Sequence, residues 1–467
     1  MARVLISAFS NVGWVPGNHH DTFVVGFMNA LERAGNHVLV VRCNDFMVSE
    51  HTDLNPYVNR SSLVQAVKTF APDIIITLNN MFPCGEFITD TDCPIFIYPA
   101  DGYDFFKFKD LIGQHLERFF FFHINEDNYN DYKENIPSLK DERLCRFSYA
   151  TDFRPRDVDQ DLPLSFLGSL PNHTFELGRY FTLWPVDRAE AGNEVKKNFC
   201  DELDRFRLAP HSKFNCDLPG FQQGEHFYSP ETIAVFLITT KKRFEILSSL
   251  ADMGLSIYGY SSFCMAGIYN YDLLRAFNYE QCITVDQAET LYNRSQIALN
   301  LPNARSTRGF SWRVPDVLAT NSVLLSFFSP DLSDLMRGYA DLPMYTSVTE
   351  ARTIAEKLLK DEIWRRDLSE ASRKMIEDKC RFEPNFKNME EASGVTLHSD
   401  KKGVIEHLFH TEHLHDIISE PESPVVSEAD SPAKVEPKTP RRAFSRLKKE
   451  LVKTLPYFIA KKFLGDR

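Results

Sequence analysis

The stretch RFEILSSLADMGLSIYG at residues 243–259 decides the fold class of this chain. Its apolar side chains have the spacing of a helix, which we predict over residues 242–253, and Gly254 is a residue type that commonly ends a helix. The apolar run Leu255–Gly259 follows directly and predicts a buried strand. A helix that leads at once into a buried strand is typical of α/β proteins, whose parallel sheet is covered by helices on both faces.

The same alternation continues on both sides of this stretch. Further predicted strands lie at residues 3–9, 37–42, 73–78, 93–98, 164–168, 235–239, 297–301 and 322–326. Predicted helices lie at residues 22–34, 61–70, 286–296, 313–321, 348–359 and 362–378. The pattern restarts after a polar, proline-bearing break at residues 151–163. We therefore predict two doubly wound halves, residues 1–155 and 156–385, with residues 171–235 as an insertion in the second half.

Composition and charge limit the class of partner. The 467 residues are 43% hydrophobic and carry a formal net charge of −12, which describes a globular protein with little affinity for polyanions. We therefore expect no nucleic-acid partner. The nine cysteines are scattered and form no CxxC pair, and the first residues predict a strand instead of a signal peptide. We expect a cytoplasmic protein.

Four blocks in the second half carry a resemblance to a known family. They are Asp161–Ser169, Arg243–Gly259, Leu291–Leu301 and Arg313–Ser326. In their order and spacing they resemble the CgeB-like group of GT-B glycosyltransferases, which has a nucleotide-sugar domain of the glycosyl transferase family 1 type. The resemblance implies an α/β GT-B fold, in which two Rossmann-like domains face a cleft. The first half would be the acceptor-side domain and the second half the donor domain.

The last block departs from the family pattern Arg-x-Phe-Glu-x-x-x-x-Gly, whose Glu binds the ribose hydroxyls of the donor. Here Pro315, Asp316 and Asn321 stand where the pattern has Phe, Glu and Gly. Asp316 keeps the carboxylate but is one methylene shorter, and a proline is tolerated in the first turn of a helix. The departure is consistent with a donor bound in a modified way or with a copy that has lost activity.

The resemblance and the chemistry of the reaction together indicate a donor site. Such a site needs cations for the diphosphate and a carboxylate for the ribose, roles that we assign to Arg313 and Asp316. Glycines at strand ends allow the backbone to approach a phosphate or a sugar. The candidate donor-binding residues are Gly168, Ser169, Arg243, Gly259, Tyr260, Arg313 and Asp316. The charged residues also have structural alternatives. Arg313 would form a surface salt bridge, Asp316 would be a charge at a helix N-terminus, and Lys242 and Arg243 would be solvated residues at the start of a helix.

Two residues of the first half are candidate catalytic bases for the acceptor hydroxyl. His20 lies in a loop after the first strand, directly before a helix, and imidazole is a suitable base near neutral pH. Asp101 follows the strand at residues 93–98, and a carboxylate there would remove a sugar hydroxyl proton in an inverting displacement. Both loops also have the composition of helix caps and turns, so the choice stays open.

The sequence contains acidic and histidine groups that are similar to metal ligands. Asp90–Asp92 and Asp157–Asp159 match the Asp-x-Asp of metal-dependent GT-A transferases, but both fall in predicted turns of an acidic chain. A histidine group has helical spacing, which we interpret as a surface helix instead of a zinc site. Its members are His407, His410, His413 and His415. We expect no metal ion, and no cofactor beyond a nucleotide-sugar co-substrate.

The end of the chain differs from the rest. Residues 386–440 predict a variable segment and a disordered linker, because residues 420–440 are rich in Pro, Ser and Glu. Residues 441–467 hold nine basic and two acidic residues around an apolar stripe, which predicts an amphipathic helix that binds an anionic membrane surface or a partner protein. The residues that define this tail are Phe444, Leu447, Lys448, Lys449, Leu451, Leu455 and Phe458.

These observations predict a metal-independent glycosyltransferase, peripheral on the cytoplasmic membrane face. It would transfer a sugar from an activated nucleotide-sugar to a lipid-linked or surface-glycan acceptor, in cell-surface polysaccharide biosynthesis. Two alternatives remain open. One is a nucleotide-sugar epimerase, which shares the fold, and the other is a non-catalytic scaffold that binds an enzyme partner.

Overall fold

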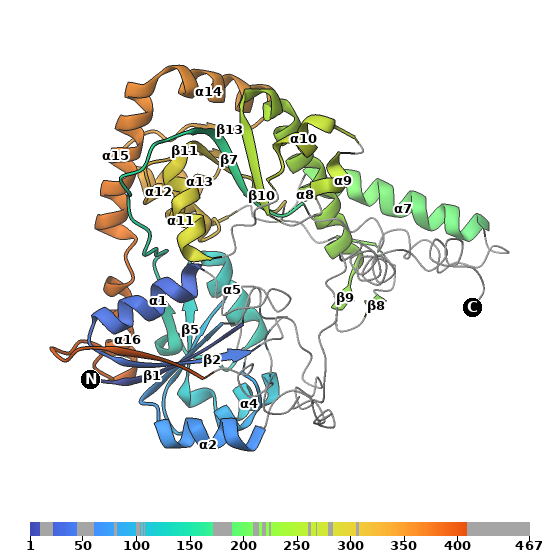
Figure 1. The fold of residues 1–467 in the computed structure, drawn as a ribbon. Helices are drawn as coiled ribbons and strands as arrows, with labels where there is room; N and C mark the ends of the chain where they lie inside the picture. The colour runs from blue at the N-terminus through green and yellow to red at the C-terminus, as the bar shows by residue number, and fades with distance from the viewer. Residues whose placement is uncertain are drawn as a thin grey trace, which may run out of the picture. The chain divides into compact units, whose positions relative to one another are not determined.

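The computed structural model describes residues 1–9, 22–43, 60–78, 82–99, 103, 106, 108–170, 189–208, 214–216, 221–223, 226–259, 263–267, 269–278, 284–304 and 308–408. Residues 1–417 form one compact unit and residues 418–467 a second one. The described residues all lie in the first unit, which contains two parallel sheets with their helices (Figure 1).

The first sheet is built from the strands of the first half and one later strand. The strands run in the order β14-β2-β1-β3-β4-β5-β6, and every neighbouring pair is parallel. They are β1 Arg3–Phe9, β2 His37–Cys43, β3 Ile74–Leu78, β4 Ile95–Tyr98, β5 Phe119–His123, β6 Leu144–Arg146 and β14 Val404–Leu408. The described helices of this half are α1 Thr22–Arg33, α2 Arg60–Phe70, α3 Glu86–Thr89, α4 Lys109–Gln114, α5 Glu126–Asn135 and α16 Glu383–Ser393.

Both faces of this sheet are buried, which explains why its strands are continuous apolar runs. In β1, Val4 and Ile6 belong to one core together with Phe27 of α1, whereas Leu5 belongs to the core on the other face. Neighbouring residues of a strand point to opposite faces, so a strand covered on both sides has no alternation of polar and apolar residues. The pattern of apolar runs therefore predicted the parallel sheet correctly.

The second sheet repeats this architecture in the order β10-β7-β11-β12-β13, again with every neighbouring pair parallel. Its strands are β7 Leu162–Gly168, β10 Leu255–Gly259, β11 Ser295–Asn300, β12 Val323–Phe327 and β13 Met344–Tyr345, and the insertion adds the antiparallel pair β8 Phe221–Gln223 and β9 His226–Tyr228. The described helices are α7 Ala189–Leu208, α8 Pro230–Leu250, α9 Phe263–Ala266, α10 Tyr271–Ala276, α11 Val285–Arg294, α12 Arg313–Leu318, α13 Pro330–Met336, α14 Val348–Lys360 and α15 Glu362–Lys379. The two parallel α/β sheets confirm the predicted GT-B fold class.

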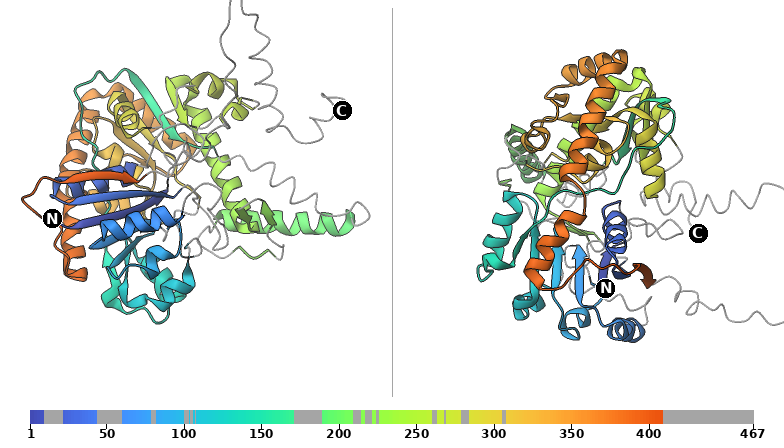
Figure 2. Two further views of the ribbon diagram at one scale, coloured as in Figure 1. Left: turned by 60° about the horizontal axis from the view of Figure 1, so that its bottom comes forward. Right: turned by 90° about the vertical axis from the view of Figure 1, so that its left-hand side faces the viewer.

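The strand predicted at residues 235–239 is wrong, because these residues belong to the long helix α8. Ser229 caps this helix by accepting a backbone hydrogen bond, and a proline occupies the first turn. The apolar face of α8 packs against Phe199 and Phe206 of α7, which extends away from the two sheets (Figure 2). Packing against the insertion thus stabilises a helix in a segment whose β-branched residues favour a strand.

The chain returns to the first half after α15. Helix α16 packs on the first sheet through Phe386 and Met389, so α15 and α16 follow one another from one half to the other (Figure 2). Strand β14 then pairs with β2 at the edge of the first sheet. We expected residues 386–440 to be a variable segment and linker, whereas residues 386–408 are an integral part of the first half.

Candidate functional site

A cavity of about 490 Å³ lies at the carboxyl ends of three neighbouring strands of the second sheet. Residues 301–304 follow β11, residues 327–328 end and follow β12, and residues 345–348 end and follow β13, while helix α8 contributes Lys242 and Arg243 to the wall. Ligands of open parallel sheets bind at this edge. The other lining residues are Glu245, Ile246 and Pro330.

Arg243 is the most constrained charged residue of this cavity. Its Nε donates to the carbonyl oxygen of Leu301 at 3.0 Å, and its Nη1 donates to the carbonyl oxygen of Ser169 at 2.6 Å. The guanidinium therefore ties the end of β7 to the end of β11. Burial, and secondarily the positive charge of Arg313, lower the pKa of Arg243 to about 10.

Two cations, Lys242 and Arg243, line the cavity together with the exposed carboxylate Glu245. Arg313 is not among the lining residues but is close enough to lower the pKa of Arg243. None of the three cations forms an ion pair in the part of the chain that the structure describes. The Lys242 Nζ lies 5.3 Å from the centroid of the Phe327 ring, and burial lowers the pKa of Lys242. A buried charge without a protein partner is costly unless a ligand supplies the opposite charge. The cavity therefore has the electrostatic character of an anion site.

Gly168 and Gly259, both predicted to bind the donor, lie next to each other where two strands approach closely. Gly259 and Gly168 are register partners at the ends of β10 and β7. Gly259 has a φ of 152°, and a Cβ atom on it would lie 1.8 Å from the Gly168 carbonyl oxygen. Gly259 is thus required for the close approach of two strands. Neither glycine is among the described residues that line the cavity.

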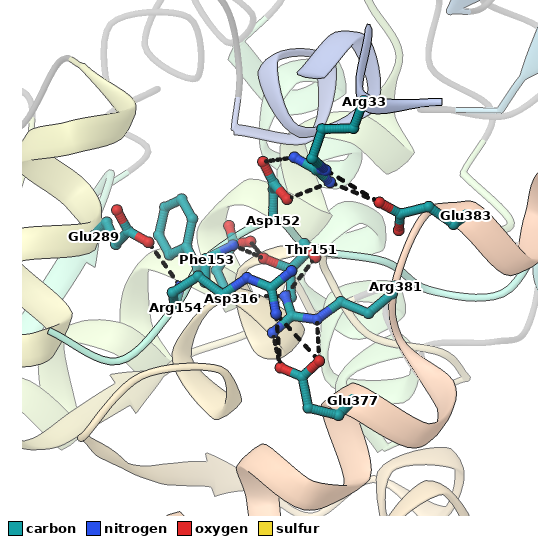
Figure 3. Close-up of polar contacts among 10 residues, drawn as sticks. All are labelled: Arg33, Thr151, Asp152, Phe153, Arg154, Glu289, Asp316, Glu377, Arg381 and Glu383. Carbon is teal, nitrogen blue, oxygen red and sulfur yellow. Dashed lines mark hydrogen bonds and ion pairs between the residues drawn. The ribbon is translucent and has the colours of Figure 1, made fainter. Parts of the chain in front are cut away.

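Asp316, which we expected to bind the ribose hydroxyls, accepts hydrogen bonds from two side chains of the protein. Its carboxylate is buried, with 4% of the residue exposed. One oxygen accepts a hydrogen bond from the Thr151 hydroxyl at 2.5 Å (Figure 3), and the other accepts one from the Thr22 hydroxyl at 2.7 Å. Asp316 is not among the described residues that line the cavity. The carboxylate connects the second half to α1 and to the segment that joins the two halves.

The chain crosses between the two halves twice, near residues 151–153 and near residues 380–383, and these two segments are hydrogen-bonded to each other next to Asp316. The Thr151 N–H donates to the Cys380 carbonyl at 3.0 Å, and Arg381 Nη1 donates to the carbonyl oxygens of Thr151 at 2.8 Å and Phe153 at 2.9 Å. Arg381 also pairs with Glu377 (Figure 3). These hydrogen bonds hold the outgoing and returning segments together.

An ion-pair cluster extends this junction to α1. Arg33, at the end of α1, pairs with Asp152 at 2.7 Å and with Glu383 at 2.8 Å (Figure 3). Asp152 belongs to the outgoing segment and Glu383 to the start of α16. Helix α1 is therefore held at both ends, by Asp316 at its first residue and by this cluster at its last.

Several predicted site residues lie outside the described residues. These are the candidate bases His20 and Asp101, the donor-site residue Tyr260, and the tail residues Phe444, Leu447, Lys448, Lys449, Leu451, Leu455 and Phe458. Of the predicted donor residues that the structure describes, Arg243 and Ser169 are in direct contact, and Arg313 is close enough to affect the pKa of Arg243.

The acidic and histidine motifs that are similar to metal ligands in sequence show no metal-binding arrangement among the described residues. Asp90 pairs with Lys68 at 2.9 Å, an interaction that holds the pKa of this carboxyl below its ordinary value. His407 lies in β14, so the surface helix predicted for the histidine group does not include it, and the other three histidines are outside the described residues. Among the described residues, no group of three His, Cys, Asp or Glu side chains is arranged to hold a metal ion. None of the described helices is long and apolar enough to cross a membrane.

The sequence of the second half matches a known family. Residues 242–391, which include Arg243, Arg313 and the strand ends around the cavity, match the family described as glycosyl transferase-like. This part of the chain is similar to the glycosyl transferase-like family. The match confirms the predicted resemblance to glycosyltransferases and the predicted enzyme class, while the narrower CgeB-like assignment stays a prediction. No curated protein sequence matches the chain.

Solved structures similar to this chain include three with extensive coverage. Sucrose-phosphate synthase from Thermosynechococcus elongatus has 11% identity and a TM-score of 0.46, covering 83% of this chain and 97% of its own. A glycosyltransferase from Rickettsia africae has 9% identity and a TM-score of 0.47, covering 84% and 98%. Anabaena HepE in complex with UDP and glucose has 9% identity and a TM-score of 0.46, covering 84% and 99%.

Sequence reasoning missed several residues that shape the junction between the two halves. Thr151 and Arg381 belong to no motif, because their partners are backbone carbonyls and a carboxylate more than 100 residues away. Trp312 precedes the Arg313 block directly and stacks on the first half. A tryptophan and a phenylalanine close together in a loop after a strand end were the available signal, and Phe310 is the second of these aromatic residues.

Proposed function

We propose that the protein transfers a sugar from a nucleotide-sugar donor, bound at the 490 Å³ cavity, to a lipid-linked or surface-glycan acceptor without a metal ion. The observation that carries this proposal is the pair of cations that line the cavity, Lys242 and Arg243, with the charge of Arg313 nearby. None of the three has a carboxylate partner among the described residues. A diphosphate supplies the missing negative charge, and the family match supplies the class of reaction.

The chemistry assigns a specific task to these cations. During transfer, the bond between the sugar anomeric carbon and the diphosphate oxygen breaks, and negative charge grows on the leaving diphosphate. Guanidinium and ammonium groups that are already in place stabilise this charge in the transition state without reorganisation. Arg243 is held by two backbone carbonyls and so has a fixed orientation toward the cavity. These cations would take the role that a divalent ion has in metal-dependent transferases.

A binding screen tests the donor assignment. The full chain is titrated with UDP, GDP, ADP, the matching monophosphates and inorganic pyrophosphate, in EDTA and again with Mg²⁺. We expect one nucleoside diphosphate to raise the melting temperature in EDTA, with a stabilisation of about 2.7 kcal/mol at 100 times its dissociation constant. The monophosphate should bind more weakly. If no nucleoside diphosphate binds, or if binding requires Mg²⁺, the proposal is incorrect.

The tail extends the proposal to localisation. Because residues 441–467 combine nine basic residues with an apolar stripe, we propose that they hold the enzyme at the cytoplasmic membrane face, where a lipid-linked acceptor would be found. Sedimentation with vesicles that contain phosphatidylserine, an anionic lipid of the cytoplasmic leaflet, tests this. The full chain should sediment and the chain without residues 441–467 should not. Sedimentation of the shortened chain would contradict the proposal, and binding of neither would contradict it as well.

A further inference from the structure

The connection between β11 and α12 touches both the cavity and the first half of the chain. Residues 301–304 line the cavity. Further along the same connection, the Trp312 ring stacks on Phe23 of α1, with ring centroids 5.2 Å apart and an interplanar angle of 17°. The Trp312 ring also lies 6.1 Å from the ring of Tyr98, at the end of β4. A residue next to the cationic cluster therefore packs into the core of the other half.

Two further contacts reinforce this attachment. The Phe310 ring stacks on Tyr149 at 3.8 Å, and the Phe310 N–H donates to the Tyr149 hydroxyl at 3.0 Å. Asp316, one turn after Trp312, accepts the hydroxyl hydrogen bonds of Thr22 and Thr151. The segment from residue 310 to residue 316 thus contacts α1, β4 and the joining segment through aromatic and polar side chains.

Helical geometry places Arg313 on a different face from these contacts. Residues 312 and 316 are four positions apart, so their side chains share one face of the turn. Arg313 is offset from Trp312 by about 100° around the helix axis, since an α-helix has 3.6 residues per turn. Its charge acts on Arg243 at the cavity, as the lowered pKa of Arg243 indicates. One face of the turn is therefore bound to the first half, while Arg313 lies on an adjacent face and is not itself among the residues that line the cavity.

We propose that Trp312 and Asp316 are positioning residues that make nucleotide binding depend on the seating of the first half, because they attach to that half the connection whose residues 301–304 line the cavity. This inference rests on the proposed function of the cavity. It assigns Asp316 to the junction between the halves and not to the donor ribose. Coupling of this kind is reciprocal, so a nucleotide that binds at the cavity also stabilises the contacts of Trp312 with Phe23.

Substitutions at the contact, remote from the cavity lining, test this coupling. Trp312→Leu removes the stacked ring, and we expect the dissociation constant of the nucleoside diphosphate that the wild type binds best, among UDP, GDP and ADP, to rise about tenfold. Trp312→Phe keeps an aromatic ring and should stay within about threefold of the wild type. Phe23→Leu should raise the dissociation constant by a similar factor. The double variant, Phe23→Leu with Trp312→Leu, should raise it no further than either single variant, because both substitutions remove the same contact.

Matched controls separate positioning from general destabilisation. Trp364→Leu removes a tryptophan that packs on the core of the second half, away from the first half, and should leave the affinity unchanged. Thr22→Val removes one hydroxyl from Asp316 and should weaken binding by about threefold to tenfold. Thr320→Val removes a hydroxyl that donates to the Val317 carbonyl within the second half, and it should have no effect on affinity.

The outcomes distinguish the two levels of the proposal. Wild-type affinity in both Trp312→Leu and Thr22→Val, in variants whose far-ultraviolet circular dichroism matches the wild type, would overturn the coupling. An equal loss in Trp364→Leu would also overturn it, because the effect would then be one of stability alone. Failure of the wild type itself to bind any nucleoside diphosphate would overturn the proposed function and this inference together.

Discussion

Replacing Arg243 with methionine is the sharpest test of the diphosphate site. Methionine keeps an unbranched apolar side chain but removes the positive charge and every N–H donor. We expect nucleoside diphosphate binding to weaken about 100-fold, while the protein stays folded. Transfer activity should fall by at least the same factor, because the charge on the leaving diphosphate grows during the reaction.

The magnitude follows from the surroundings of the guanidinium. Burial, and secondarily the charge of Arg313, lower the pKa of Arg243 to about 10. Relative to the ordinary pKa of an arginine, this corresponds to about 3 kcal/mol of unfavourable free energy for the charged form. A diphosphate in the cavity neutralises that charge, so its binding recovers up to this free energy. A free energy of about 3 kcal/mol is equivalent to about a 100-fold change in the dissociation constant.

The free energy of unfolding should change less, because two effects oppose each other. Without the guanidinium, the carbonyls of Ser169 and Leu301 lose their donors, at a cost of about 1–3 kcal/mol each. Removing a buried charge that lacks a carboxylate partner among the described residues relieves about 3 kcal/mol. We therefore expect a net change in stability of at most about 3 kcal/mol.

Isothermal titration calorimetry measures the affinity directly, and Arg373→Met is the matched control. Arg373 is a half-buried arginine of the same half that donates to the Thr320 carbonyl at 3.3 Å, and burial lowers its pKa too. It does not line the cavity, so its loss should leave affinity unchanged. Equal affinity in the wild type and Arg243→Met would refute the assignment of Arg243 to the diphosphate. Equal losses in both variants would refute the electrostatic reasoning.

Gly259→Ala should lower the free energy of unfolding by about 2–4 kcal/mol in urea denaturation, because the positive φ of Gly259 disfavours a side chain and the added Cβ would meet a carbonyl oxygen at 1.8 Å. Gly338 also has a positive φ but has open space around it, so an equal loss of stability in Gly338→Ala would show that the clash has no effect. Arg381→Met should lower the free energy of unfolding by about 2–4 kcal/mol in the same assay, because two carbonyls at the junction lose their donor. Arg154→Met, at an exposed ion pair, should lower it by less than about 1 kcal/mol, and similar values for the two variants would contradict the role of Arg381 at the junction.

Local pattern predicted most of the secondary structure of this chain. The runs at residues 3–9 and 255–259 became β1 and β10 with the predicted bounds. These elements were predictable because burial on both faces selects apolar, β-branched residues at every position. Residues 235–239 have the same composition but form part of α8, because the insertion packs on a helix there. Composition alone does not distinguish the two outcomes, since packing partners decide between them.

The candidate site was predicted in part for a related reason. Arg243 and Ser169 were assigned to one site from two blocks of the family pattern, and they are in contact. Arg243 nevertheless lies within α8 and not after the strand predicted at residues 235–239. Asp316 was assigned to the ribose from its place in a motif, but its carboxylate binds Thr22 and Thr151. Those threonines are 294 and 165 residues away in sequence, and no local pattern reports a contact at that distance.

The sequence by itself therefore determined the two parallel α/β halves, the edge at which we propose that the donor binds and the type of residue available there. These features depend on the periodicity of apolar residues and on strand ends, which are local properties of the chain. Only the tertiary structure decided which cations lack a carboxylate partner among the described residues, which face of α12 contacts the first half and what Asp316 binds. Those properties depend on which distant side chains meet in the buried interior. There, a missing or added partner of a charged group changes the free energy of unfolding by about 3 kcal/mol.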